Sequence, residues 1–270
     1  MKSIARRTLL AGGLALAATP VLAAPPQPWI AYERRLRGLL DDPPDGDFDQ
    51  EFEQTLLDLN NIMRDRQGLP PLAMDRGLTL AARAHAADMA VTGLLDHRTP
   101  EGYSAASRVG LLARDVVGVA GENIAMREKA MGAVGPDELM TQWRESPGHR
   151  ANLLAREFTH VGFGVLVQGQ GHRAIAVGAY ADVVARLVRP APLRVRTAEE
   201  IAQALSRTAT PIRRFSVAQP DGEAMITTYV DGHPEAQRPL LTPGAWQLRP
   251  HLSSGEHRYQ VAWGPVFVLG

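Results

Sequence analysis

The hydrophobic period of this chain changes once, and that change constrains the possible folds more than any other feature. Between residues 47 and 154, apolar side chains recur at helical spacing in a series of short segments. From Val161 to Val184 the period becomes two, and the polar turn at 168–171 separates two runs, which predicts a β-hairpin. Helices followed by an antiparallel hairpin predict a layered α+β domain, which we expect over residues 47–187.

Capping signals mark the start of each expected helix. Asp47, with Gln50 three residues later, resembles a capping box ahead of an apolar stripe. A proline at the first helical position, followed by acidic residues, is typical of the helix that starts at Pro136. The expected helices begin near Asp47, Asp75, Ser104, Gly135 and Ser146.

The first residues resemble an export signal rather than a part of the fold. Lys2, Arg6 and Arg7 precede a mild apolar stretch, and a small-residue cleavage site follows at 21–23. The arginine pair leaves both twin-arginine and general secretory export open. We expect a signal peptide over residues 1–23 and a periplasmic or secreted protein. Because no later stretch has roughly 18 uninterrupted apolar residues, we expect no transmembrane span after cleavage.

Two regions flank the expected domain. Residues 24–46 have prolines at both ends and are expected to be a spacer. Its basic amphipathic middle could touch a membrane surface, but we favour a short helix packed on the domain or a mobile arm. Residues 188–270 begin with a proline-rich linker, and a short helix is expected at 198–206.

The rest of the last region alternates in short runs with Asp-Gly turns at 221–222 and 231–232, and predicts a β-rich extension. We expect Trp246, Trp263 and Phe267 to form its core, and the alternative is that exposed aromatic side chains form a binding face.

Charge and cysteine content exclude several classes of function. The chain carries 29 basic and 29 acidic residues, so loss of the three basic residues of the signal leaves a net charge of about −3. A nearly neutral chain without a basic run is not expected to bind nucleic acid. There is no cysteine, which rules out a disulfide framework and thiol chemistry.

Three segments place two histidines and a glutamate where helices and strands are expected to end. They are Asp96-His97, Gly121-Glu122-Asn123-Ile124, and Gly148-His149 in the short turn after Trp143. The ends of separate elements can meet in a groove, so these side chains are the first candidates for a functional site.

Together with two flanking motifs, these segments resemble the CAP superfamily, the fold of cysteine-rich secretory proteins, insect antigen 5 and plant pathogenesis-related protein 1. They are most similar to its cysteine-free bacterial branch. The flanking motifs are Leu59-Asn60-Asn61-Ile62-Met63-Arg64, with Asn60 at the place of a family histidine, and Val161-Gly162-Phe163-Gly164. The resemblance covers Leu56 to Asp182 and implies a CAP-type α-β-α sandwich, here with a small C-terminal β-rich extension.

The resemblance also implies a central cleft with a tetrad of two histidines and two glutamates, which binds a divalent cation such as zinc in some relatives. His97, Glu122 and His149 match three members of that tetrad. The fourth position, three residues after the helix tryptophan, is Ser146, and the adjacent Glu145 would point about 100° away on a helix. The implied metal set, for zinc or another divalent cation, is therefore incomplete.

The chemistry of these three residues allows more than one role. Two imidazoles and a carboxylate can hold zinc with an open position for water, whose pKa the metal lowers to about 7. Without a metal, His97 or His149 could act as a general base that Glu122 orients. Alternatively, Glu122 holds the two histidines by hydrogen bonds under the cleft, as a buried carboxylate requires. We favour a structural or ligand-positioning role over catalysis, because a shared fold says little about chemistry.

Asn123, Ser146 and His160 are further candidates for the groove wall. Each has a plainer interpretation: Asn123 can bond the loop backbone, Ser146 before a proline can cap a helix, and His160 can lie at a strand end. His85, on the apolar face of its helix, is expected to be a core histidine with a satisfied hydrogen bond.

Three functions follow from these features. The first is an exported binding module whose groove holds a small or extended ligand such as a lipid, a sterol, a peptide or cell-wall material. The second is a hydrolase, metal-assisted or acid–base, that acts on peptide or cell-wall substrates. The third is an envelope interaction protein that works through residues 190–270.

Overall fold

The computed structural model describes residues 29–197, 200–201, 212, 214–230, 242–255 and 258–270. The expected signal peptide and the turn at 231–232 lie outside the described residues, as does most of the helix expected at 198–206. No helix in the described part of the chain is long and apolar enough to cross a membrane.

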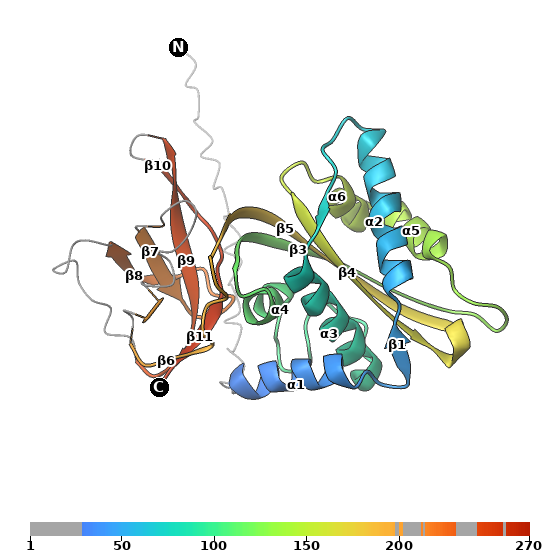
Figure 1. The fold of residues 1–270 in the computed structure, drawn as a ribbon, viewed down its shortest axis with the longest axis horizontal. Coiled ribbons are helices and arrows are strands. Elements are labelled where there is room, and N and C mark those ends of the chain that lie inside the picture. The colour runs from blue at the N-terminus through green and yellow to red at the C-terminus, as the bar shows by residue number, and fades with distance from the viewer. Residues whose placement is uncertain (1–28, 198–199, 202–211, 213, 231–241, 256–257) are drawn as a thin grey trace, which may run out of the picture.

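The first domain has a five-stranded sheet between two layers of helices (Figure 1). Its elements are α1 (Trp29–Asp41), β1 (Gly46–Phe48), α2 (Gln50–Asp65), β2 (Ala73–Met74), α3 (Arg76–Thr92), α4 (Ala105–Leu112), β3 (Val116–Glu128), α5 (Pro136–Glu145), α6 (Pro147–Leu154), β4 (His160–Gln168) and β5 (Arg173–Arg186). The strands lie in the order β1, β4, β5, β3, and β2 pairs parallel with β4. α2, α5 and α6 cover one face, while α3 covers the other with α1 and α4 beside it. The expected α+β sandwich is confirmed.

Local signals place most helix starts correctly. The Asp75 side chain accepts from the Leu78 N–H (2.8 Å) to begin α3, which ends at Gly93 in the left-handed conformation. The first helix is an exception, because Asp49, not Asp47, caps α2 by accepting from the Phe52 N–H (2.9 Å). Asp47 instead lies in β1, where pairing with β4 holds it in an extended conformation.

Two glycines let α3 lie directly on the sheet. A Cβ on Gly162 would come within 2.0 Å of the Thr79 backbone nitrogen, and one on Gly164 within 2.2 Å of the Arg83 nitrogen. The close approach buries the alanine-rich face of α3 against β4 and β5. It also fixes α3, and the loop that follows it, relative to the sheet.

The long strand β3 was not expected from the sequence. It pairs antiparallel with β5 along its whole length, from Val116 opposite Arg186 to Glu128 opposite Arg173. Two glycines and a polar centre break the alternation of this segment, so its extended conformation comes from pairing with β5. Glu122, expected at the end of an element, therefore lies in the middle of an edge strand.

The start of the described chain packs on the domain. Within the expected spacer, residues 29–41 form α1, whose Tyr32 and Leu36 are buried. The Tyr32 ring stacks on Tyr103, with centroids 3.7 Å apart. Residues 29–41 thus form a helix that packs on the domain.

A second sheet follows the first domain and shares core residues with it. Its strands are β6 (Arg194–Val195), β7 (Arg214–Ala218), β8 (Met225–Val230), β9 (Gly244–Gly255), β10 (Arg258–Val261) and β11 (Val266–Leu269). Trp246 and Phe267 are buried in its core, together with Val117 and Leu187 from the first domain. Trp263, expected in this core, is only half-buried and lines a cleft between the two sheets, because it pairs with Gly118 at the edge of β3.

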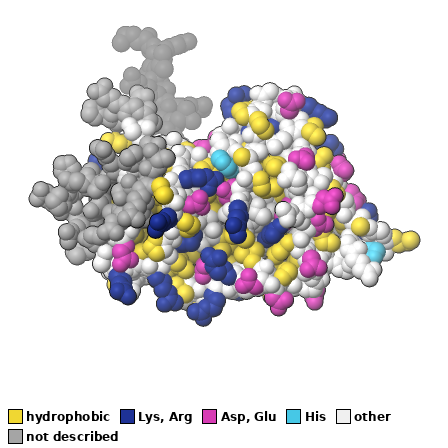
Figure 2. Space-filling model, in the orientation of Figure 1, with side chains coloured by type: hydrophobic (Ala, Val, Ile, Leu, Met, Phe, Trp, Pro, Cys, Tyr) yellow, Lys and Arg dark blue, Asp and Glu magenta, His cyan; other side chains and the backbone are white. Residues whose placement is uncertain are grey.

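Figure 2 shows one face of the molecule, on which basic and acidic side chains are interspersed. Hydrophobic side chains are scattered among them rather than gathered into one patch. This mixed surface is the one expected of a nearly neutral chain.

Candidate functional site

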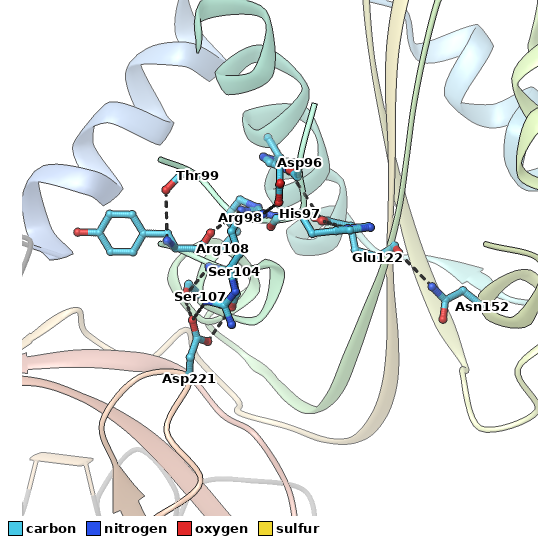
Figure 3. A network of polar contacts seen from close by, with 12 residues as sticks. Asp96, His97, Arg98, Thr99, Ser104, Ser107, Arg108, Glu122, Asn152 and Asp221 are labelled. Carbon is cyan, nitrogen blue, oxygen red and sulfur yellow. Dashed lines mark hydrogen bonds and ion pairs between the residues drawn. The ribbon is translucent and has the colours of Figure 1, made fainter. Parts of the chain in front are cut away.

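His97 lies on a loop that several hydrogen bonds hold in place. His85 Nε2 bonds the Asp96 carbonyl oxygen (2.9 Å), and the Arg98 N–H donates to the Asp96 carboxylate (2.8 Å). The Tyr103 N–H donates to the Thr99 hydroxyl (3.2 Å) and closes the loop before α4. The His97 side chain remains about half exposed, at 53%, on the cleft side of this loop (Figure 3).

A buried ion pair lies beneath His97. Glu122 Oε1 accepts from His97 Nδ1 (3.0 Å), and Glu122 Oε2 accepts from Arg108 Nη2 (2.7 Å). Arg108 is fully buried and also donates to the carbonyl oxygens of His97 (2.9 Å) and Tyr103 (3.2 Å). One guanidinium therefore joins the loop of His97 to the strand of Glu122 (Figure 3).

The charges of this cluster follow from burial and from Arg108. Burial would raise the pKa of Glu122, but the Arg108 guanidinium and the His97 hydrogen bond outweigh it and hold that pKa at about 2. The hydrogen bond to Glu122 raises the pKa of His97. Because the carboxylate takes the Nδ1–H of His97, Nε2 is the nitrogen available to a ligand in the cleft.

His85 is a core residue, as expected. Burial, with Arg108 nearby, lowers its pKa to about 4, so its imidazole is neutral at physiological pH. Its hydrogen bond to Asp96 satisfies one ring nitrogen. Its Nε2 also lies 3.7 Å from Glu122 Oε1, which places a third histidine beside the site glutamate.

His149 lies near His97 but not against it. The two ring centroids are 6.4 Å apart, and His149 belongs to α6. Asn123 is fully buried and donates to the His149 carbonyl oxygen (3.0 Å), while Asn152 donates to the Glu122 carbonyl oxygen (3.0 Å). The two asparagines also bond each other (2.9 Å), so they brace α6 against β3.

Neither His149 nor any of the three groove candidates, Asn123, Ser146 and His160, is among the residues that line the cleft. Ser146 sits at the junction of α5 and α6, where its carbonyl oxygen accepts from the Arg150 N–H (2.8 Å). His160 begins β4, and its Nδ1 bonds the neighbouring Thr159 hydroxyl (2.9 Å). Ser146 thus occupies the N-cap position of α6 without a capping hydrogen bond from its side chain, and His160 lies at a strand end.

The cleft has a volume of ≈ 430 Å³, and both domains form its walls. His97, Val119, Ala120 and Glu122 contribute from the first domain, and Asp221 and Trp263 from the second. The Asp221 carboxylate accepts from the Ser104 and Ser107 hydroxyls, at 2.7 Å each, which fixes this wall to the start of α4 (Figure 3).

Arg108 and Asp221 were not predicted to belong to this site, and Trp263 was expected in a core, with an exposed binding face as the alternative. Arg108 left a signal, since a charged residue on the apolar face of a short helix predicts a buried ion pair. Asp221 left none, because only the packing of the second sheet on the first brings it to the cleft of Glu122, about a hundred residues away in the chain.

The arrangement does not fit a metal ion. Both carboxylate oxygens of Glu122 are engaged, one by His97 and one by Arg108, whose fixed positive charge lies 2.7 Å away and would repel a cation. Within the described residues, no group of three or more histidines and carboxylates is placed to hold a metal. The expected set of His97, Glu122 and His149 is therefore not assembled as metal ligands in this structure.

Comparison with known proteins identifies the first domain. Residues 57–180 match the CAP family, the cysteine-rich secretory protein family. This part of the chain is a CAP domain. The resemblance drawn from short motifs is thereby confirmed, and the CAP match ends before the second sheet begins.

Curated relatives of the CAP domain come from Bacillus subtilis. The uncharacterized protein YkwD is 35% identical over 121 residues, which are 44% of this chain and 44% of YkwD. The uncharacterized membrane protein YlbC is 33% identical over 113 residues, 42% of this chain and 31% of YlbC. The matches thus span less than half of each curated relative.

Solved structures with CAP or SCP domains are similar over about half of the chain. An extracellular SCP-domain protein from Bacillus anthracis is 29% identical and covers 49% of this chain and 41% of that protein, with a TM-score of 0.40. The structure of NaASP2 with Zn²⁺ is 16% identical and covers 52% of this chain and 84% of NaASP2, with a TM-score of 0.36.

Proposed function

We propose that the cleft between the CAP domain and the extension binds a small or extended ligand, which His97 and Glu122 help to position. The cleft itself carries this proposal: its volume of ≈ 430 Å³ lies within the range of about 300–1,000 Å³ that is usual for ligand sites. The family resemblance suggests lipids, sterols, peptides or cell-wall material as ligands. The signal expected at residues 1–23 supports action in the periplasm or outside the cell.

The state of the site favours positioning over metal chemistry. Arg108 keeps Glu122 charged and hydrogen-bonded, and Glu122 in turn fixes the ring of His97. A rigid imidazole with one free nitrogen can donate to or accept from a ligand in the cleft. No step of this function requires a bound ion.

Filling the cleft tests the proposal. Ala106 lines it, so Ala106→Trp should block it while leaving the buried ion pair intact. Three probes represent the ligand classes: solubilised peptidoglycan strands, phosphatidylglycerol vesicles, and a library of capped pentapeptides. We expect at least one probe to bind the wild type and to lose about tenfold or more in affinity with Ala106→Trp. The proposal is contradicted if every probe binds the wild type and Ala106→Trp with equal affinity, or if no probe binds either protein.

An acid–base hydrolase is the second candidate, and the His97–Glu122 hydrogen bond of 3.0 Å favours it. A carboxylate-oriented histidine that opens on a cleft is a common arrangement for a general base. His97→Gln should then abolish hydrolysis of the bound probe while its affinity changes little. Wild-type protein that leaves that probe intact under prolonged incubation would contradict the hydrolase.

Zinc titration checks the poor fit to a metal. Calorimetry on the wild type and on His97→Ala/His149→Ala should give equally weak heats, because Arg108 holds the carboxylate that a cation would need. Micromolar binding that the double variant loses would restore the metal-assisted hydrolase as a candidate.

A further inference from the structure

The cleft exposes a short stretch of the open edge of β3. β3 is the last strand of its sheet, so β5 pairs with only one of its two sides. At Gly118 the open side is already occupied: the Gly118 N–H donates to the Trp263 carbonyl oxygen (2.8 Å), and the Trp263 N–H donates back (3.0 Å). The extension therefore pairs with this edge at the border of the cleft.

Ala120 turns its backbone N–H and C=O to the same open side, because these groups alternate along a strand. Ala181, the residue of β5 opposite Ala120, points its carbonyl oxygen away from β3 and accepts from the Thr159 N–H (3.0 Å). The two residues therefore share no backbone hydrogen bond across the ladder. Glu122, two residues further along β3, gives its carbonyl oxygen to Asn152 on the open side (3.0 Å). Between these satisfied positions, the N–H and C=O of Ala120 have no hydrogen-bond partner among the described residues.

The cleft wall therefore offers a ligand one backbone donor, the Ala120 N–H, and one backbone acceptor, the Ala120 carbonyl oxygen. A polypeptide in extended conformation supplies both at the spacing of a strand, whereas a lipid tail or a sterol ring supplies neither. The alanines at 105 and 106 leave room beside the edge, and the half-buried Trp263 offers apolar surface at one end. These features favour a peptide over a lipid or a sterol, and over a glycan strand, whose amides are branches and do not form a backbone at the spacing of a strand.

We propose that the cleft takes an extended peptide segment that pairs with β3 at Ala120 and continues the bridge made by Trp263. This rests on the proposed function, because it names the ligand class and the contact that recognises it. From Gly118 to Glu122 the strand rises about 13 Å, which is the length of about three or four extended residues, and the peptide would pair through the backbone groups of Ala120 between the two occupied positions. Affinity then comes from main-chain hydrogen bonds, and sequence preference from the side chains along the cleft.

Proline substitution tests the pairing. Ala120→Pro removes the outward N–H and places ring atoms on the open side of β3. The ladder with β5 does not use that N–H, and proline is tolerated on edge strands for this reason. Met126→Pro is the matched control, because Met126 lies on the same edge of β3, an even number of residues further, and outside the cleft lining. Circular dichroism and urea midpoints of both variants check that β3 still forms.

The probe is the library of capped pentapeptides, beside a second library with alternate amides N-methylated. We expect Ala120→Pro and N-methylation each to weaken binding about tenfold, and Met126→Pro to change it less than about twofold. We also expect the Ala120 amide of the wild type to shift in ¹⁵N–¹H spectra and to gain protection from hydrogen exchange when peptide is added.

Each other outcome has a distinct meaning. Peptide binding that resists both Ala120→Pro and N-methylation overturns the pairing but leaves the cleft as a peptide site. Binding of peptidoglycan strands or vesicles alone, blocked by Ala106→Trp, overturns the peptide and keeps the proposed function. Failure of every probe to bind overturns both.

Discussion

Arg108 shows how much of this site depends on one side chain. It is buried, it neutralises Glu122, and it holds the backbone of the loop that carries His97. A buried ion pair gains little over an apolar pair, yet removal of one member leaves an unpaired charge in a poorly solvated position. Arg108 and Glu122 should therefore behave as a unit.

Removing Arg108 should destabilise the fold strongly. We expect Arg108→Met to lower the free energy of unfolding by about 3–5 kcal/mol, since Glu122 is left buried without its partner. The double variant Arg108→Met/Glu122→Gln should recover much of that loss. Urea unfolding measures all three proteins. Arg98→Met is the control, because Arg98 is 60% exposed, and a change of less than about 1 kcal/mol is expected.

His85 should make the protein sensitive to mild acid. In the unfolded chain its imidazole takes a proton near pH 6.5, but in the folded protein only near pH 4. Its contribution to stability is therefore complete above pH 6.5 and is lost as the pH falls toward 4. We expect the free energy of unfolding to drop by about 2 kcal/mol between pH 7 and pH 4.5.

His85→Gln isolates this effect, because glutamine can still donate to the Asp96 carbonyl oxygen. Over the same pH range, the fall in its unfolding free energy should be smaller than that of the wild type, and the difference between the two falls should be about 2 kcal/mol. Glu122, whose folded pKa is about 2, contributes only to losses below about pH 4.5. Parallel pH profiles for the two proteins would show that His85 is not the cause.

At the scale of the element, α3 depends on the glycines of β4 that face it. Gly164→Ala would push a methyl group against the Arg83 backbone, 2.2 Å away, and backbone cannot rotate aside. We expect a loss of about 3 kcal/mol in thermal or urea unfolding. Gly148→Ala, in open space on α6, should be neutral or stabilise by up to about 1 kcal/mol. Equal effects of the two substitutions would contradict the close packing.

The same contrast explains which elements could be predicted. α3 and α4 begin at Asp75 and Ser104, whose side chains bond backbone within the next turn, so the local sequence contains the whole signal. β3 depends on β5, about 50 residues later, and its own sequence hardly alternates. The motif resemblance identified His97 and Glu122, which the structure brings to 3.0 Å. It could not supply the cleft wall of Asp221 and Trp263, which lies beyond the CAP match.

At the scale of the whole molecule, the two sheets share a core. Val117 and Leu187 of the CAP domain are buried among residues of the second sheet. Arg114 adds hydrogen bonds to the carbonyl oxygens of Ala191 (2.6 Å) and Val266 (2.8 Å). Because neither sheet can separate without exposing these groups, the two should unfold together.

Val117→Ala tests this coupling. We expect a loss of about 2 kcal/mol and faster hydrogen exchange in both sheets, read by mass spectrometry on peptides from β5 and β9. Val188→Ala, where the valine is 66% exposed, should change stability by less than about 0.5 kcal/mol. Faster exchange in β9 alone would show that the extension opens independently.

The bridge between Gly118 and Trp263 has a further consequence for aggregation, because the unpaired backbone groups of an open sheet edge can pair with another chain. Within the cleft, Trp263 closes one end of this edge and Asn152 the other, and among the described residues a single residue stays open between them. So short a gap offers no long ladder to a second sheet, so the cleft can expose a strand edge to a small ligand without also exposing it to a whole strand of another chain.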